Sequence, residues 1–319
     1  MNSKMQFPYR HYLGNPVAKP PCRMLNALMY GFFVKGDLEL LQSYLDDTIN
    51  SIEMDKTEFV ALSDTLMLTF TDIENISSKT APFSNYGWMQ ETDIIFWIPV
   101  AKVDKSSRAI QHLYWFPAFI TVNNINALIN GRETWGYNKY LCRYEMPSIG
   151  TTPKRFSISL ETFQPFSPTT KMDWHCLLEI EVKNSKESWL SEVADLGEHL
   201  AHFLFKSNQK VDVSLGFLKQ LLNGFVHPQM DQILFKQFPD GKGEFAVYQA
   251  VTHSPSEIKK IHKVGLLKDD FTLNVHQIDS FPLKQMFGID LGVQTLELGF
   301  YVLMDFDQLE ATELVEKGV

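Results

Sequence analysis

The sequence predicts a mainly β protein of the α+β class, in which antiparallel strands predominate and only a few helices flank them. Strand-like segments outnumber helix-like segments, and they do not alternate with helices as a doubly wound parallel sheet requires. The run IIFWIPV at 94–100 is apolar throughout, which is typical of a strand buried on both faces. Together these observations favour an antiparallel architecture with a strand through its centre.

Two-residue periodicity indicates the remaining strands. Residues 59–72 alternate leucine and phenylalanine with threonine. Further strands are expected at 155–161, 176–183, 231–238 and 244–252, and in the late run LELGFYVLMDFDQL. The turn PDGKG separates two of these segments and suits a β-hairpin.

Helical spacing occurs in two places. After Asp37, leucines fall at helical intervals, and the Asp37 carboxylate can cap the first free backbone N–H groups. Residues 188–205 place apolar side chains on one face, which predicts a second amphipathic helix with a core face. The residues of that face are Trp189, Val193, Leu196, Leu200 and Phe203.

Composition fits one globular domain. A chain of 319 residues with 45% hydrophobic and 21% charged residues can form a core without metal or disulfide support. No repeat or low-complexity linker divides it, so we expect one domain over 1–319, with an N-terminal arm at 1–21 and a C-terminal tail at 308–319. The net charge of −9 argues against nucleic acid as a partner, because phosphate binding needs a basic surface.

The cysteines and the apolar runs indicate a cytoplasmic protein. Cys22, Cys142 and Cys176 are odd in number and form no CxxC, so we expect free thiols. The N-terminus lacks the apolar region of a signal peptide. No run approaches the roughly 18 apolar residues of a membrane span, so no membrane association is expected.

Several common site motifs are absent. The sequence contains no GxGxxG, P-loop, HExxH or GxSxG. His199 and His202 are three residues apart on the predicted second helix, but no suitable acidic partner lies near them. We therefore expect no metal and no organic cofactor.

The segment GRETWGYNKY at 131–140 carries the most chemical information. A lysine attacks a ketone only as the neutral amine, and burial against apolar groups or a nearby cation lowers its pKa. Trp135, Tyr137 and Tyr140 provide apolar surface around Lys139, and Arg132 is a nearby cation. The alternative is an exposed lysine in a polar turn, as most lysines are exposed.

GRETWGYNKY resembles the signature of the acetoacetate decarboxylase family, in which a lysine forms a Schiff base with a β-keto acid. Weaker similarity extends over much of 37–307. It covers IPVAK at 98–102, VNN at 122–124, the strand–turn–strand at 230–251 and the segment at 275–290. The resemblance implies strongly curved antiparallel sheets that form a barrel or cone around a central cavity, and a homo-oligomer.

The resemblance also assigns catalytic roles. Lys139 falls on the Schiff-base lysine. The family's active-site glutamate corresponds to Asp93 by counting and to Glu91 by residue type. Since residues two apart on a strand share a face, both carboxylates could reach one cavity. Either could instead be a solvated charge at a strand end. Arg132 and Glu133 match the start of the motif, where an ion pair fixing the loop is the favoured interpretation.

Three positions depart from the family pattern. Tyr140 stands where well-known members have a second lysine, and Asn138 replaces a proline. For the family's N-terminal arginine, gap-free counting reaches Ala27, and Arg23 is the nearest candidate. Trp135, Tyr140 and Arg23 are therefore predicted as residues that bind substrate or fix the loop.

The expected function is decarboxylation of a small β-keto acid such as acetoacetate, with the lysine amine as nucleophile. One alternative keeps the Schiff base and performs aldol or dehydration chemistry on a pyruvate-like keto acid. Another is a non-catalytic barrel that binds a small molecule and uses the lysine as a counter-ion.

Overall fold

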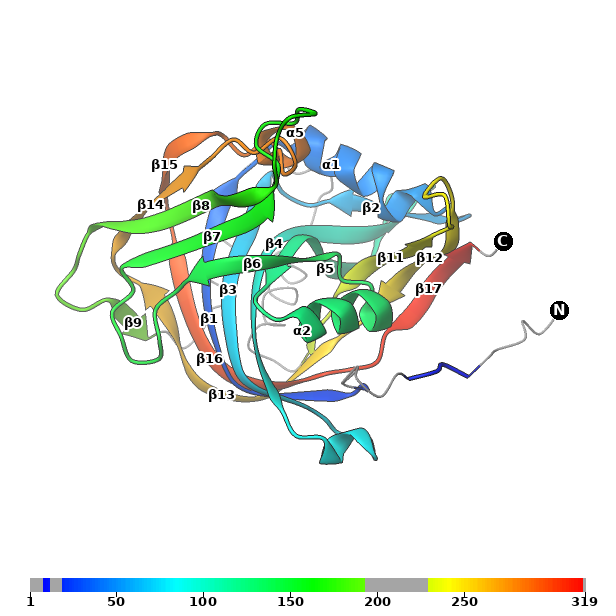
Figure 1. Cartoon of the computed structure of the whole chain (residues 1–319), viewed down its shortest axis with the longest axis horizontal. Coiled ribbons are helices and arrows are strands. Elements are labelled where there is room, and N and C mark those ends of the chain that lie inside the picture. The colour runs from blue at the N-terminus through cyan, green and yellow to red at the C-terminus, as the bar shows by residue number, and fades with distance from the viewer. Residues whose placement is uncertain (1–7, 12–18, 193–228, 318–319) are drawn as a thin grey trace.

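A computed structural model describes residues 8–11, 19–192 and 229–317, and β-strands account for most of these (Figure 1). The strands are β1 Cys22–Lys35, β2 Thr57–Ala61, β3 Thr65–Ser78, β4 Met89–Asp104, β5 Ile110–Val122, β6 Lys139–Glu145, β7 Arg155–Thr162, β8 Asp173–Asn184, β9 Leu190–Glu192, β10 Gln229–Met230, β11 Ile233–Pro239, β12 Ala246–His253, β13 Ser256–Leu267, β14 Asp270–Val275, β15 Gly292–Leu296, β16 Gly299–Gln308 and β17 Thr312–Lys317. The labelled helices are α1 Leu38–Asp47, α2 Ile125–Asn130 and α5 Leu283–Phe287. Shorter turns occupy Ile49–Ser51, Phe83–Asn85 and the π-helical Gly131–Trp135.

Fourteen strands form one large sheet, and β11, β12 and β17 form a second of three strands. The large sheet follows the order β10-β13-β16-β1-β3-β4-β5-β6-β7-β8-β14-β15, with β2 on β4 and β9 on β13. Its long strands curve strongly (Figure 1). The mainly β prediction is thus confirmed, while closure of the sheet into a barrel stays a prediction.

Most predicted elements occur at their expected positions. The run 94–100 lies within β4, and the strand predicted over 59–72 is divided between β2 and β3. PDGKG connects β11 to β12, which pair antiparallel. The Asp37 side chain accepts from the backbone N–H groups of Glu39 and Leu40, so the predicted cap of α1 is confirmed.

Two regions differ from the expectation. Leu190–Glu192, inside the predicted helix at 188–205, form strand β9 because β13 offers them backbone hydrogen-bonding partners, and Ser188 and Trp189 before them are not helical either. Residues 193–205 of that prediction lie outside the described residues. Within the expected tail at 308–319, β17 pairs with β12. The single-domain assignment stays a prediction.

The two faces of the large sheet pack into different cores. The first core contains Phe32, Phe96 and Phe156, together with residues of α1 and α5. The second core contains Met29 and Trp97. Along the middle of β4, alternate side chains enter the two cores, which explains why residues 94–100 are apolar on both faces. The candidate site lies in the second core.

One connection breaks the antiparallel pattern. Strands β5 and β6 pair in parallel, with Ile120 opposite Lys139, because α2 and the π-helical turn carry the chain back between them. The start of β6 is thereby placed beside the middle of the large sheet. Among the described residues, no helix is long and apolar enough to span a membrane.

Candidate active site

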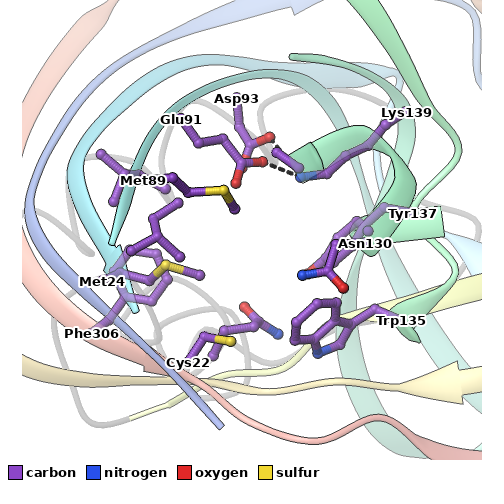
Figure 2. Close-up of a pocket in the computed structure, with 15 residues that line it drawn as sticks. Cys22, Met24, Met89, Glu91, Asp93, Asn130, Trp135, Tyr137, Lys139 and Phe306 are labelled. Atoms are coloured by element: carbon purple, nitrogen blue, oxygen red, sulfur yellow. Dashed lines mark hydrogen bonds and ion pairs between the residues drawn. The ribbon is translucent and has the colours of Figure 1, made fainter. Parts of the chain in front are cut away.

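Lys139 is buried in contact with two carboxylates (Figure 2). The residue is only 6% exposed. Its Nζ contacts Glu91 Oε1, and it lies 3.1 Å from Asp93 Oδ1. The exposed-turn alternative for this lysine is therefore wrong.

Strand β4 positions both carboxylates. Met89, Glu91 and Asp93 follow one another at alternate positions and line the same cavity. Pairing with β3 sets Glu91 opposite Ile73 and Asp93 opposite Thr71. Both carboxylates thus face the cavity, and alternation along a strand is the reason.

The π-helical turn shapes the approach to Lys139. The backbone N–H groups of Gly136 and Tyr137 both donate to the Gly131 carbonyl, at 2.9 and 3.0 Å. Gly136 ends the turn with a φ of +103°, a conformation that favours glycine. At Gly131, a Cβ atom would lie 2.7 Å from Lys139 Cδ. The glycine that opens GRETWGYNKY therefore leaves the space that the lysine side chain occupies.

Aromatic residues of the same segment form the adjacent wall. Lys139 Nζ lies 5.5 Å from the centre of the Tyr137 ring, within the range of a cation–π contact. Trp135 is buried beside it, and its indole N–H donates to the carbonyl of Leu309 at 2.9 Å. Both side chains line the cavity, as Figure 2 shows.

Arg132 and Glu133 lie outside this cavity and have separate partners. The Arg132 guanidinium donates to Asn138 Oδ1 at 2.8 Å and to the Lys139 carbonyl at 3.2 Å. Glu133 accepts from the Tyr9 hydroxyl at 2.9 Å. Arg132 thus holds the loop through Asn138 and the backbone, whereas the sequence suggested a pair with Glu133.

Tyr140 and Arg23 point away from the site. Tyr140 follows Lys139 on β6, so its ring faces the other side and packs 4.9 Å from the Phe281 ring. Its hydroxyl accepts from Asn138 at 2.9 Å. Arg23 is exposed, whereas its strand neighbours Cys22 and Met24 line the cavity. Neither of these two predicted residues lines the cavity next to Lys139.

The cavity next to Lys139 has a volume of about 60 Å³. Sequence reasoning did not identify several of its walls, which are Cys22, Met24, Met89, Asn130, Phe306 and Gln308. They come from β1, β4, α2 and β16, and only sheet pairing brings these elements together. Among the described residues that line it, Lys139 is the one cation.

The electrostatics differ from the expectation for a desolvated lysine. Burial acts to lower the pKa of Lys139, but the carboxylates of Asp93 and Glu91 oppose it, and the net pKa is raised. Burial and the neighbouring Glu91 charge raise the pKa of Asp93 well above its ordinary value, although Lys139 opposes them. The site therefore favours the ammonium form of Lys139 and the protonated form of Asp93 more than water does.

The described residues contain no group of three or more His, Cys, Asp or Glu side chains that could hold a metal ion. His199 and His202 lie outside the described residues. The chemistry available at this cavity is that of one amine, two carboxyl groups, the amides of Asn130 and Gln308, the Cys22 thiol and the Tyr137 phenol.

The protein is thus a β-rich protein in which a lysine amine is buried in a cavity beside two carboxylates. Solved structures identify the fold. This chain is similar to acetoacetate decarboxylase from Legionella pneumophila subsp. pneumophila, with a TM-score of 0.60 and 11% identity over 99% of this chain and 98% of the other. It is also similar to an acetoacetate decarboxylase-like enzyme from Sphingomonas wittichii, with a TM-score of 0.55 and 11% identity over 93% and 94% of the two chains.

A third similar structure is the enduracididine biosynthesis enzyme MppR, complexed with the condensation product of pyruvate and imidazole 4-carboxaldehyde. Its TM-score is 0.50, with 11% identity over 94% of this chain and 91% of the other. No protein-family model matches the sequence, and no curated protein matches it in sequence. The chain therefore has the acetoacetate decarboxylase-like fold, as its motif predicted.

Replacing Gly131 by alanine should displace the Lys139 side chain while the fold persists. The new Cβ would meet Cδ and Cε of a flexible side chain, so the lysine moves and the backbone stays. We expect at least a tenfold loss of covalent labelling of Lys139 by a ketone under reducing conditions. Gly241→Ala is the control, because a Cβ there meets nothing within 4 Å. Equal labelling of the two variants would contradict this account of Gly131.

Removing the cation should destabilise the protein. Lys139→Ala leaves two buried carboxyl groups without a partner, and we expect unfolding at pH 7 to become easier by about 3–5 kcal/mol. The loss should shrink as pH falls, since protonated carboxyls need no counter-ion. For Asp93 this begins above the ordinary carboxyl range, because its pKa is raised. Urea unfolding at pH 7 and pH 5 measures both effects.

Lys259→Ala removes an exposed lysine that pairs with Glu257 and lies 3.6 Å from Asp307, and it should destabilise the protein far less than Lys139→Ala at both pH values. A Lys139→Ala variant as stable as this control would show that the buried carboxyls do not depend on the lysine.

Proposed function

We propose that this protein is a Schiff-base-forming carbon–carbon lyase that acts on a small keto acid, with decarboxylation of a β-keto acid such as acetoacetate as the first candidate reaction. The observation that supports it is Lys139, an amine buried in a cavity and in contact with two carboxyl groups that can exchange protons with it. No cofactor takes part in this proposal.

The first step is loss of a proton from the Lys139 ammonium. Glu91 is in contact with Nζ and is the natural acceptor. The neutral amine then attacks the ketone carbon, and the carbonyl oxygen leaves as water after accepting two protons. One of these comes from the amine and one from a carboxyl of the site. The product is an iminium cation at Lys139.

The iminium is an electron sink for the next step. The bond from the α carbon to the carboxylate breaks, CO2 departs, and the electron pair forms an enamine with the iminium nitrogen. A carboxyl group then protonates the α carbon, for which Asp93 is suited because its raised pKa lets it hold a proton above the ordinary carboxyl range. Addition of water to the iminium releases the ketone and restores the amine.

An aldol or dehydration reaction on a pyruvate-like keto acid is the second candidate. It uses the same iminium and enamine and forms or breaks a different bond. The similar fold of MppR, solved with a condensation product of pyruvate and an aldehyde, supports it.

The non-catalytic alternative fits the site less well. A lysine that serves as a counter-ion for a bound carboxylate must have an uncompensated charge. Here Glu91 and Asp93 already neutralise Lys139, so the ammonium offers a ligand carboxylate little net attraction.

Covalent trapping tests the central claim. Incubation with acetoacetate or pyruvate followed by borohydride should add one reduced adduct per chain on Lys139, because hydride fixes an iminium as a stable amine. Peptide mass spectrometry locates the adduct, and CO2 release separates decarboxylation from aldol chemistry. An unlabelled wild type, with an authentic acetoacetate decarboxylase labelled in parallel, would refute the proposal. An adduct that persists in Lys139→Ala would identify another amine as the nucleophile.

The charge of Glu91 should control the protonation of Lys139. Glu91→Gln removes a negative charge that raises the pKa of the lysine, so that pKa should fall. Competitive acetylation with a trace of acetic anhydride, followed across pH by mass spectrometry, reports the midpoint for the Lys139 amine. Asp93→Asn should shift the midpoint in the same direction. A midpoint that stays constant or rises in both variants would contradict the electrostatic account.

A further inference from the structure

A second chamber borders the Lys139 cavity, with which it shares lining residues. We call it the rear chamber, and it has a volume of about 70 Å³. Its apolar walls are Met29, Ile95, Trp97, Ile120, Met230 and Met304. The Lys139 cavity and the rear chamber share Ile73, Asp93, Tyr137, Phe306 and Gln308 as lining residues. A molecule held at Lys139 can therefore extend past Asp93 into the rear chamber.

Strand β4 forms a polarity gradient between the two chambers. Glu91 lines the Lys139 cavity, Asp93 lines both, and Ile95 and Trp97 line the rear chamber. These residues occupy alternate positions, so they lie in a row along one face of the strand. A ligand aligned with β4 would meet carboxyl groups at one end and hydrocarbon at the other.

The polar groups of the rear chamber bond to one another. The Tyr137 hydroxyl donates to Gln232 Oε1 at 2.6 Å, and Gln232 Nε2 donates to Ser256 Oγ at 2.8 Å. Ser256 in turn donates to Gln308 Oε1 at 2.6 Å. This series of hydrogen bonds satisfies the amides and hydroxyls along one wall and fixes their orientation. A charged or strongly polar ligand group would have to break these bonds, whereas a hydrocarbon group would not.

We infer that the rear chamber binds an apolar substituent of the substrate, so the carbonyl compound that reacts at Lys139 carries a hydrocarbon chain of several carbons. This inference rests on the proposed Schiff-base function, since Lys139 fixes the position of the carbonyl. Acetoacetate, with a single methyl group beyond its ketone, would leave the rear chamber empty. Each methylene that enters it should tighten binding about fourfold, from the transfer free energy of a buried methylene.

Methyl ketones of increasing length test this assignment, because they are the products of β-keto acid decarboxylation and differ only in chain length. Acetone, 2-hexanone and 2-octanone are compared in two measurements. Labelling of Lys139 with sodium cyanoborohydride reports the Schiff base, and isothermal titration calorimetry without reductant reports binding. We expect both to favour the longer ketones, with a gain of at least tenfold from acetone to 2-hexanone.

Two matched variants locate the effect. Ile258 is a partly buried residue of β13 that lines the rear chamber, so Ile258→Phe should fill the chamber and remove the preference for long chains. Val264 is also partly buried on β13 and packs against the second core, but it lines neither chamber. Val264→Phe should keep the preference.

The outcomes separate the two hypotheses. Lys139 labelling without dependence on chain length would overturn the rear-chamber assignment and leave the Schiff base intact. Calorimetric preference for 2-octanone that Ile258→Phe removes, with no labelling by any ketone, would support the chamber and refute the Schiff base. Equal calorimetric affinity for all three ketones, or a preference that survives in Ile258→Phe, overturns the assignment whatever the labelling shows.

Discussion

The buried contact of Lys139 with Glu91 and Asp93 is the constraint that the rest of the site depends on. A charged group removed from water is costly unless a partner compensates it, and the loss of one partner exposes the full penalty. Here one ammonium faces two carboxyls, so charge balance is reached when the carboxyls retain a proton between them. The raised pKa of Asp93 expresses that balance, and it also creates a proton donor next to the nucleophile.

Placing this group requires elements from distant parts of the chain. The carboxylates come from the middle strand β4, where pairing with β3 sets their register. The lysine comes from β6, which reaches β5 only through the parallel crossover. Gly131 leaves space for the side chain, and Arg132 holds the backbone carbonyl of Lys139 from outside. The start of GRETWGYNKY thus has a steric role at Gly131 and a positional role at Arg132.

Because the sheet has two faces, Tyr140 lies on the face opposite to the Lys139 cavity. Its identity as a phenol cannot set the charge of the cavity, because alternation along β6 sends it to the Phe281 side. Control of Lys139 therefore lies with the carboxyls and the Tyr137 ring. The pKa of Lys139 is raised, whereas burial alone would lower it. The amine is therefore favoured as a cation, and it has to pass its proton to a neighbour before it can react.

The sequence by itself predicted about half of the strands, among them β4, β7, β8, β11 and β12, together with the capped helix α1 and Lys139 as the informative residue. Period-two alternation, local capping and a contiguous motif are properties of neighbouring residues. The sequence also placed Glu91 and Asp93 on one face for the same reason. Only the tertiary structure decided that Arg23 points outward, that Asn130 and Gln308 line the cavity, and that Leu190–Glu192 form a strand. It alone fixed the direction of the Lys139 pKa, since Glu91 is 48 residues away in sequence and reaches the lysine only through the packing of β4 and β6.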